Sequence, residues 1–435
     1  MVPAIALIAA LGGLSAYTFG LYGRLLESTK SKSLGEIWEK EKGESSAWIV
    51  SMASMTFCYG AALSYSILLG DTIPALVQAT GLKSGTLATS RSLWIVLLTT
   101  FVLRPLCNLK SLASLAPISI VGVVGVIATA CFLGWRCPNI NAASPYNAAS
   151  SIGAGGLLST LSRDQVPSFG TYSTGLFSPS SLILMGMAAT AFLGHFSVAK
   201  FHQSLTSRSG DVSVVEKSST TDTSNGPLDD FFKVTLGGFG GVTVINCLIM
   251  AFGFLTFGGN SKGVILNNFS TLDPGASLCR LLMAICVIGG YPFVFSTTLS
   301  EALELLQRVK PTKVTTKSAN KQRPLSRIFS GIHNVSETTL SRILLISLAG
   351  LALVMKNAGF VVGLNGALMG SAMIYIFPSL LFLKQTSKQM MKSSPFSSRT
   401  VLERNFCRFL VGFGVLAAVA GGGGLVMNTY FPELL

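Results

Sequence analysis

The chain has 435 residues, of which 49% are hydrophobic and only 11% charged, and its mean hydropathy is +0.58. A soluble protein of this size carries roughly 25% charged residues, so the composition excludes a water-soluble globular fold. Long apolar runs separate the clusters of charge, which predicts an all-α polytopic membrane protein embedded in the lipid bilayer. The net charge of +14 then indicates a bias of basic residues toward one membrane face, and no nucleic-acid partner is expected.

The apolar runs predict ten transmembrane helices in a single domain that covers residues 1–435. The predicted spans are 3–26, 47–78, 92–106, 112–135, 180–205, 232–258, 277–306, 341–356, 360–384 and 406–428. The segments between them are too short and too weakly patterned to bury a core of their own, so no soluble domain is expected.

The basic residues predict which side of the membrane each loop occupies. Assigning successive loops to alternate sides places 25 of the 32 Lys and Arg residues on one side, which marks that side as cytosolic. Residues 207–228 and 308–327 are then disordered cytosolic loops, and residues 137–179 form an extracellular or lumenal loop. Asn268 begins an Asn-X-Ser sequon on the non-cytosolic side and is a possible glycosylation site.

The fifth predicted span, Ser181–Leu205, contains the chain's most unusual side chain for a membrane. From Gln165 to Ala199 the only ionisable side chains are Tyr172 and His195. An ionisable group inside a span is a functional candidate by default, and the small residues before His195 favour a broken helix of the kind that forms transporter sites. The alternative is a helix–helix interface with a satisfied buried histidine, and the pattern by itself leaves both open.

Two further spans carry polar candidates. Pro292 predicts a kink in span 277–306, and the hydroxyls of Thr297 and Thr298 that follow can coordinate a coupling cation or cap freed carbonyls. Tyr59 adjoins a stripe of small residues in span 47–78 that suits packing or the lining of a cavity. The cysteines lack metal-site spacing and no catalytic pair is evident, so neither a metal site nor an enzyme is expected.

Five motifs in order resemble those of the amino acid/auxin permease family, which includes vacuolar and neutral amino-acid transporters. They are Leu68–Pro74 (LLGDTIP), Ala191–Phe201 (AFLGHFSVAKF), Leu255–Gly258 (LTFG), Tyr291–Phe293 (YPF) and Tyr375–Leu381 (YIFPSLL). Together these motifs cover nearly the whole chain.

The resemblance implies a leucine-transporter-type fold of two inverted five-helix repeats plus an eleventh helix. It aligns the start of this chain with the family's second span, which leaves about ten helices and no first span. We interpret this as an incomplete N-terminus, with an encoded non-transporting form as the alternative. In that fold the broken sixth span holds the substrate, and the resemblance implies substrate-binding roles for Thr190, Ala191, Phe192 and His195, with Tyr59 and Tyr291 as neighbours.

The expected function is secondary active transport of amino acids by alternating access, without a cofactor. Neutral substrates are expected because the candidate site offers no acidic residue to bind a cationic side chain. A proton is the expected coupling ion, carried by His195, and sodium, with Thr297 and Thr298, is the alternative. A different class of function, a non-transporting amino-acid sensor or scaffold, stays open. The expected location is a vacuolar or other internal membrane, or the plasma membrane.

Overall fold

The computed structural model describes residues 1–82, 85–109, 116–147, 157–170, 179–205, 227–309, 336–390 and 398–431. The described residues are helical apart from turns and one isolated bridge between Ser168 and Gly258, which confirms the all-α prediction. Nearly all of the predicted cytosolic loops 207–228 and 308–327 lies outside the described residues, as do residues 148–156 and 171–178 of the predicted outer loop.

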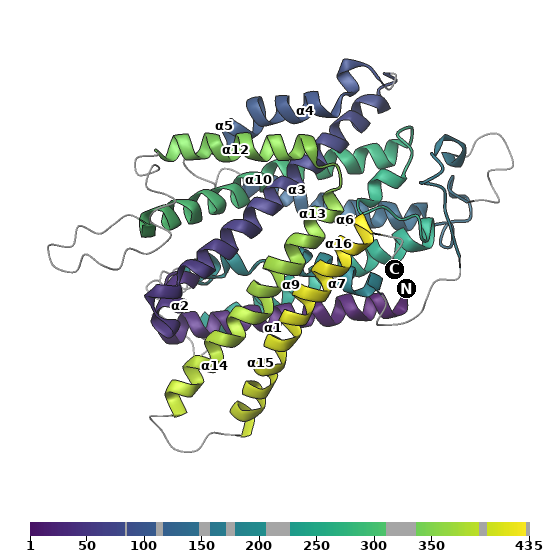
Figure 1. The fold of residues 1–435 in the computed structure, drawn as a ribbon. Helices are drawn as coiled ribbons and strands as arrows, with labels where there is room; N and C mark the ends of the chain where they lie inside the picture. Colours follow the sequence, from purple (N-terminus) through teal and green to yellow (C-terminus); the bar gives the residue numbers. More distant parts are fainter. Residues whose placement is uncertain are drawn as a thin grey trace, which may run out of the picture.

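Nine helical segments in these described ranges are long and apolar enough to cross a membrane (Figure 1). They are α1 (Val2–Thr29), α3 (Trp48–Ala79), α6 (Ala116–Arg136), α7 (Pro179–Ala191) with its continuation to residue 205, α9 (Pro227–Phe257), α10 (Pro274–Val309), α12 (Glu337–Val354), α13 (Ala358–Asn365) continued by α14 (Phe377–Met390), and α15 (Ser398–Leu416) continued by α16 (Gly422–Tyr430). Each corresponds to one of the ten predicted spans.

The remaining predicted span, 92–106, is a shorter helix than the other nine. It consists of α4 (Arg91–Leu97), a π-helical segment η3 (Leu98–Leu103) and α5 (Arg104–Cys107), of 7, 6 and 4 residues. A helix needs about 20 residues to cross a hydrocarbon core about 30 Å thick, so this segment is at the lower limit. The prediction of ten spans is therefore corrected to nine described helices long enough to span a membrane, with segment 92–106 as a shorter helix.

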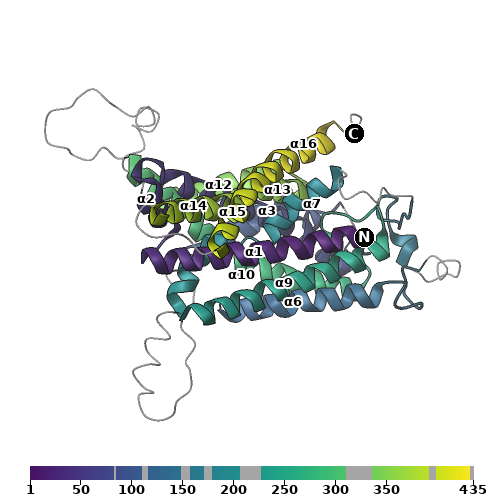
Figure 2. The ribbon, with the colours of Figure 1, turned by 90° about the horizontal axis from the view of Figure 1, so that it is seen from below.

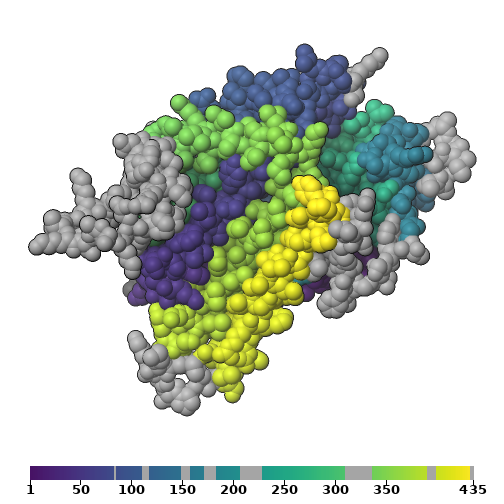
Figure 3. Space-filling view, in the orientation of Figure 1, coloured from purple at the N-terminus to yellow at the C-terminus, as the bar shows by residue number. Residues whose placement is uncertain are grey.

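The helices run between two ends of one bundle. Figure 2 shows α2 (Leu34–Lys42) at one end and the start of α1 at the other, beside the loops that follow α6. Helices α3 and α10 pack along their lengths in the interior, α1 packs against α9, and α6 against α10. On the face in Figure 3, α15 and α16 form an outer ridge beside α13 and α14. The end that holds α2 also carries Lys384 and Arg404, so we call it the basic end.

Helix α2 is an amphipathic helix at the basic end that the span prediction missed. Ser33 caps it by accepting the amide of Glu36 at 3.1 Å, so a capped start rather than an apolar run defines the helix. The buried Trp38 ring donates its Nε1 proton to Ser46 Oγ at 3.0 Å. Lys388 of α14 forms an ion pair with Glu41 at 2.9 Å. These contacts hold α2 against the bundle.

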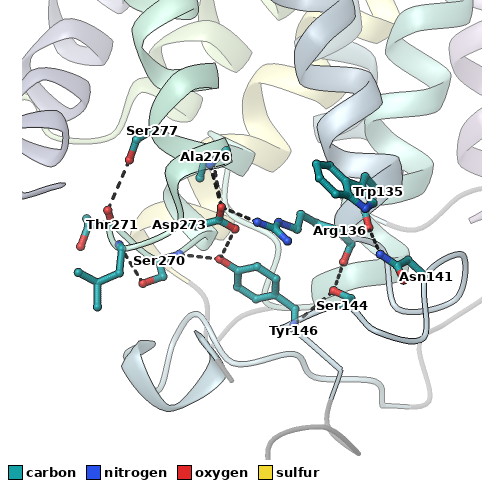
Figure 4. Close-up of polar contacts among 12 residues, drawn as sticks. Trp135, Arg136, Asn141, Ser144, Tyr146, Ser270, Thr271, Asp273, Ala276 and Ser277 are labelled. Carbon is teal, nitrogen blue, oxygen red and sulfur yellow. Dashed lines mark hydrogen bonds and ion pairs between the residues drawn. The ribbon is translucent and has the colours of Figure 1, made fainter. Parts of the chain in front are cut away.

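At the opposite end, a buried carboxylate before α10 binds the end of α6 and the loop that follows it (Figure 4). Asp273 is 0% exposed and precedes α10, where its Oδ1 accepts the amide of Gly275 at 2.9 Å and an N–H of Arg136 at 2.8 Å. Tyr146, from the predicted outer loop, donates to Asp273 Oδ2 at 3.2 Å. Burial raises the pKa of Tyr146 well above its usual range, so the phenol remains a donor at neutral pH. Asp273 therefore caps α10 and ties α6 and the outer loop to it.

The second described part of the outer loop, residues 157–170, packs on the turn before α10. Gln165 donates to the carbonyl of Asn267 at 2.6 Å, and the exposed Asp164 pairs with Lys262 at 2.7 Å. The described residues of the outer loop therefore cover the end of the bundle opposite the basic end.

We expect Asp273→Ala to lower the free energy of unfolding by about 3–5 kcal/mol, because the half-buried guanidinium of Arg136 and the phenol of Tyr146 lose their acceptor. Thermal unfolding in detergent measures the loss. Asp164→Ala removes an exposed carboxylate whose ion pair is screened by solvent, and it should leave the melting temperature nearly unchanged. Equal melting temperatures for the two variants would show that the buried network does not stabilise the fold.

Candidate functional site

The fifth span is broken in the interior of the bundle, as the sequence predicted. Helix α7 ends at Ala191, residues 192–194 are not helical, and a 3₁₀ turn η7 (His195–Ser197) leads into the helical residues 198–205. The Gly194 amide donates to the Phe192 carbonyl at 3.1 Å. The Ser197 hydroxyl donates to the Gly194 carbonyl at 2.8 Å. Local contacts of this kind let a helix open at membrane depth, where lipid offers no hydrogen bonds.

His195 lies immediately after the break and is completely buried. Its Nε2 is 3.1 Å from the Thr18 hydroxyl of α1. The rings of Phe19, Tyr22 and Phe239 surround the imidazole with centroid distances of 5.4, 6.0 and 6.1 Å. Its Nδ1 has no hydrogen-bond partner among the described residues. One ring nitrogen is therefore held in place by α1, and the other is buried without a partner.

The other three residues of the motif point to different neighbours. Phe192 is 2% exposed and packs on Gly12 of α1, where an added Cβ would lie 3.2 Å from its ring. The Thr190 hydroxyl donates to the Val362 carbonyl of α13 at 2.7 Å. Ala191 is exposed. Phe192 and His195 therefore share the α1 face of the break, whereas Thr190 faces α13.

A close approach of two backbones fixes the first half of the broken helix. Gly366 begins the π-helical segment η9 (Gly366–Gly370), and a Cβ there would meet the Gly186 carbonyl and the Thr190 hydroxyl, and would lie 2.8 Å from the Thr190 nitrogen. Glycine at 366 is thus what allows α7 to lie directly on η9.

Tyr59 and Tyr291 lie at other helix interfaces. The Tyr59 hydroxyl is 2.8 Å from Ser347 Oγ of α12, and the Tyr291 hydroxyl is 3.2 Å from Ser66 Oγ of α3. Among the described contacts, none joins either tyrosine to Phe192 or His195. The structure therefore brings Phe192 and His195 together, and places the two tyrosines around α3.

Thr297 and Thr298 follow Pro292 in α10, as the sequence predicted, and both hydroxyls bond their own helix. Thr297 donates to the Phe293 carbonyl at 3.1 Å, and Thr298 donates to the Val294 carbonyl at 2.9 Å. These hydrogen bonds satisfy carbonyls of the same helix near the proline. Each hydroxyl proton is then in use, and only the oxygen lone pairs could face an ion. The geometry favours the backbone-capping interpretation over coordination.

Asn268 is completely buried, with both ends of its amide hydrogen-bonded. Its Nδ2 donates to the Asn260 carbonyl at 2.8 Å, and its Oδ1 accepts the Lys262 amide at 2.8 Å. A glycan attached to Nδ2 would have to break this turn open, so the folded geometry opposes glycosylation at this residue.

The structure adds polar residues around the break that the sequence reading did not select. Ser15, Thr18 and Tyr22 are buried on one face of α1, at spacings of three and four residues. Asn365 of α13 packs against Gly60 and donates its Nδ2 proton to the Phe57 carbonyl of α3 at 2.9 Å. The spacing of the three α1 residues could have been recognised in the sequence, since a polar stripe on an apolar helix indicates a buried face. Asn365 carried no comparable periodic signal.

Comparison with known families gives one match. A family model described as "Transmembrane amino acid transporter protein" matches residues 1–221 and 223–427. The search of curated proteins finds no match.

Gly366→Ala tests the contact between α7 and η9. The new methyl group collides with backbone and with the Thr190 hydroxyl, so we expect a loss of about 1–3 kcal/mol in stability from overpacking. Gly423→Ala in α16 is the matched control, because a Cβ there has nothing within 4 Å. Thermal unfolding in detergent compares the two variants, and equal stability would mean that α7 is free to shift away from η9.

Proposed function

Because the chain belongs to the transmembrane amino acid transporter family, we propose that it carries neutral amino acids across a membrane by alternating access, driven by a proton gradient. Membership in this family makes the chain a multi-pass membrane transport protein and not an enzyme.

The observation that carries the proposal is the buried break in the fifth span. A helix interrupted at membrane depth costs free energy unless protein or a polar cavity satisfies the freed backbone groups, so transporters place such breaks at substrate sites. The break at residues 192–194 lies against α1, which Phe192 contacts at Gly12 and the following His195 contacts at Thr18. We assign the substrate's amine and carboxylate to the backbone of this break, with Phe192 and His195 beside them and Thr190, Ala191, Tyr59 and Tyr291 as further candidates.

The preference for neutral substrates rests on the charge around the break. The hydrogen-bond and ring contacts of His195 come from Thr18, Phe19, Tyr22 and Phe239, and Phe192 packs on Gly12, so these neighbours are all uncharged. A cationic substrate side chain in this apolar setting would lack a counter-charge, and burying an unpaired charge is strongly unfavourable.

A proton is the proposed coupling ion because His195 is the buried basic group at the break. Imidazole titrates near neutral pH in its ordinary setting, and its charge state is therefore sensitive to a physiological gradient. Sodium is the alternative ion, with Thr297 and Thr298 as its candidate ligands, although both hydroxyls bond their own helix.

We also propose the leucine-transporter-type arrangement of inverted repeats for these helices. The nine long helices support this arrangement, with the short segment α4–η3–α5 as the proposed tenth crossing and the break after α7 as the proposed counterpart of the broken sixth span. The proposed location is a vacuolar or other internal membrane, or the plasma membrane, which a fluorescent fusion would distinguish.

Purified protein in proteoliposomes tests the transport proposal. We expect labelled neutral amino acids to accumulate when the pH gradient is imposed. A gradient of one pH unit supports about tenfold accumulation for one coupled proton. Binding of an amino acid without flux would overturn transport and support the sensor or scaffold.

His195→Ala tests the coupling role directly. We expect the variant to lose the pH dependence of uptake, because no other buried imidazole lies at the break in the described structure. His202→Ala is the control, since His202 lies near the basic end, where its ring is 3.4 Å from Glu27. If a well-expressed His195→Ala protein kept the pH dependence of uptake, His195 would have a packing role and no role in proton coupling.

A further inference from the structure

A second polar feature lies between α1 and the α13–α14 helix, next to the break. Both helices carry buried polar residues at helical spacing, which places each set on one face. The residues are Ser15, Thr18 and Tyr22 on α1, and Ser371, Tyr375 and Ser379 on the facing helix. We call these six residues the polar seam.

Direct contacts join the two sides of the seam and connect it to His195. The Tyr22 hydroxyl donates to the Met373 carbonyl at 3.3 Å. The Ser15 and Tyr375 hydroxyls are neighbours across the seam. The Thr18 hydroxyl, which contacts His195, also lies 3.2 Å from the Ser15 carbonyl. The imidazole is thus at one edge of the seam.

The seam contains several buried polar atoms that make no hydrogen bond of ordinary geometry within the described residues. They are Ser15 Oγ, Ser371 Oγ, Tyr375 Oη and Ser379 Oγ, with His195 Nδ1 at the edge of the seam. The Ser15 and Tyr375 hydroxyls face each other, and Ser379 faces the Cys407 thiol, so these pairs are close without an ordinary hydrogen bond between them. Buried polar groups are nearly always satisfied by protein, water or an ion, so this cluster indicates a place where bridging water molecules would complete the hydrogen bonds.

The backbone at the seam is also irregular. Ser371 lies between η9 and a second π-helical segment η10 (Ala372–Ile376), which contains Tyr375. A π-helical segment shifts the hydrogen-bonding register of a helix, and such segments are frequent at functional sites.

Polar groups continue from the seam to the basic end of the bundle. Ser379 neighbours the thiol of Cys407 in α15. The Cys407 sulfur in turn is 4.0 Å from the Tyr17 hydroxyl. Tyr17 in turn lies within electrostatic range of Glu403, which forms an ion pair with Arg24 at 3.0 Å. The side chains of Arg24 and Glu403 are 34% and 30% exposed, so the series ends in contact with solvent.

We propose that the polar seam is a hydrated proton path that connects His195 with Glu403 and the basic end of the bundle. This inference rests on the proposed proton coupling of His195. In the path, the Glu403 carboxylate takes up a proton from solvent and passes it on, each hydroxyl or bridging water accepts one proton and donates another, and the imidazole of His195 accepts the last to give an imidazolium. Successive seam residues on one helix are a turn apart, about 5.4 Å, which one water molecule bridges.

The composition of the seam favours a proton over a metal cation. The seam has no carboxylate, and its basic atom is an imidazole nitrogen, which is a poor ligand for hard cations such as sodium. The titratable groups that face His195 are Tyr22 of α1 and, across the seam, Tyr375 of η10. Helix α9 contributes Phe239, and farther along α1 and the second half of the broken span Glu27 pairs with His202, toward the basic end.

Proton exchange at His195 tests the path without relying on transport. The chain has three histidines, and His195→Ala assigns the His195 signal in ¹⁵N-histidine-labelled protein in nanodiscs. We expect Ser379→Ala and Tyr375→Phe each to slow exchange of the imidazole proton with D₂O about tenfold, because each removes one bridging hydrogen bond. Ser64→Ala is the matched control, since Ser64 is buried and bonds its own helix at the Gly60 carbonyl. Exchange that is equal in all variants would overturn the proposal.

A second measurement separates this inference from the proposed function. In proteoliposomes, Ser379→Ala and Tyr375→Phe should lower substrate-driven proton flux about tenfold while preserving exchange of labelled for unlabelled substrate. Wild-type protein that shows no uptake would overturn the transport proposal, and the imidazole exchange rates would still decide the path. Unchanged proton flux in both variants would overturn the path and leave transport standing.

Discussion

The requirement that backbone polar groups be satisfied within the protein governs this structure. In hydrocarbon an unpaired N–H or C=O group costs several kcal/mol, which restricts the chain to helices wherever lipid surrounds it. Residues 192–194 depart from this rule deep inside the bundle, where the bonds from Gly194 to Phe192 and from Ser197 to Gly194 replace part of the lost helical pattern. The surrounding helices separate the break from lipid. Opening the helix loses backbone hydrogen bonds, and the packing of α1 against the break offsets part of that loss.

The positions of the spans could be predicted because they depend on local composition, since a long apolar run must be a helix in a membrane. The break could not be predicted from composition, because the small residues before His195 suit a helix–helix interface as well as a broken helix, and it was the family resemblance that implied the break. The short helix α4–η3–α5 and the amphipathic α2 were harder to predict. The first has fewer residues than a typical span, and the second depends on a cap at Ser33 and on packing rather than on apolar length.

The partners of the candidate side chains could not be predicted, since they come from distant parts of the chain. Tyr59 bonds Ser347 and Tyr291 bonds Ser66, pairs separated by 288 and 225 residues. A helical wheel identifies the face of a helix, whereas it contains no information about which other helix lies opposite. Thr190 illustrates the difference: the motif selected it as a candidate, and only the structure shows its hydroxyl on the Val362 carbonyl.

The two halves of the broken span are attached to different parts of the bundle. The first half is fixed to α13 and η9 by the bond from Thr190 to Val362 and by the close approach at Gly366. After the break, His195 is held by Thr18 of α1, within a ring of aromatic side chains. A displacement of α13 relative to α1 would therefore act on residues 192–194, which connect the two attachments and are not helical. The proposed substrate site and the junction between the two attachments are thus the same short stretch of chain, so the proposed alternating access would change the site directly.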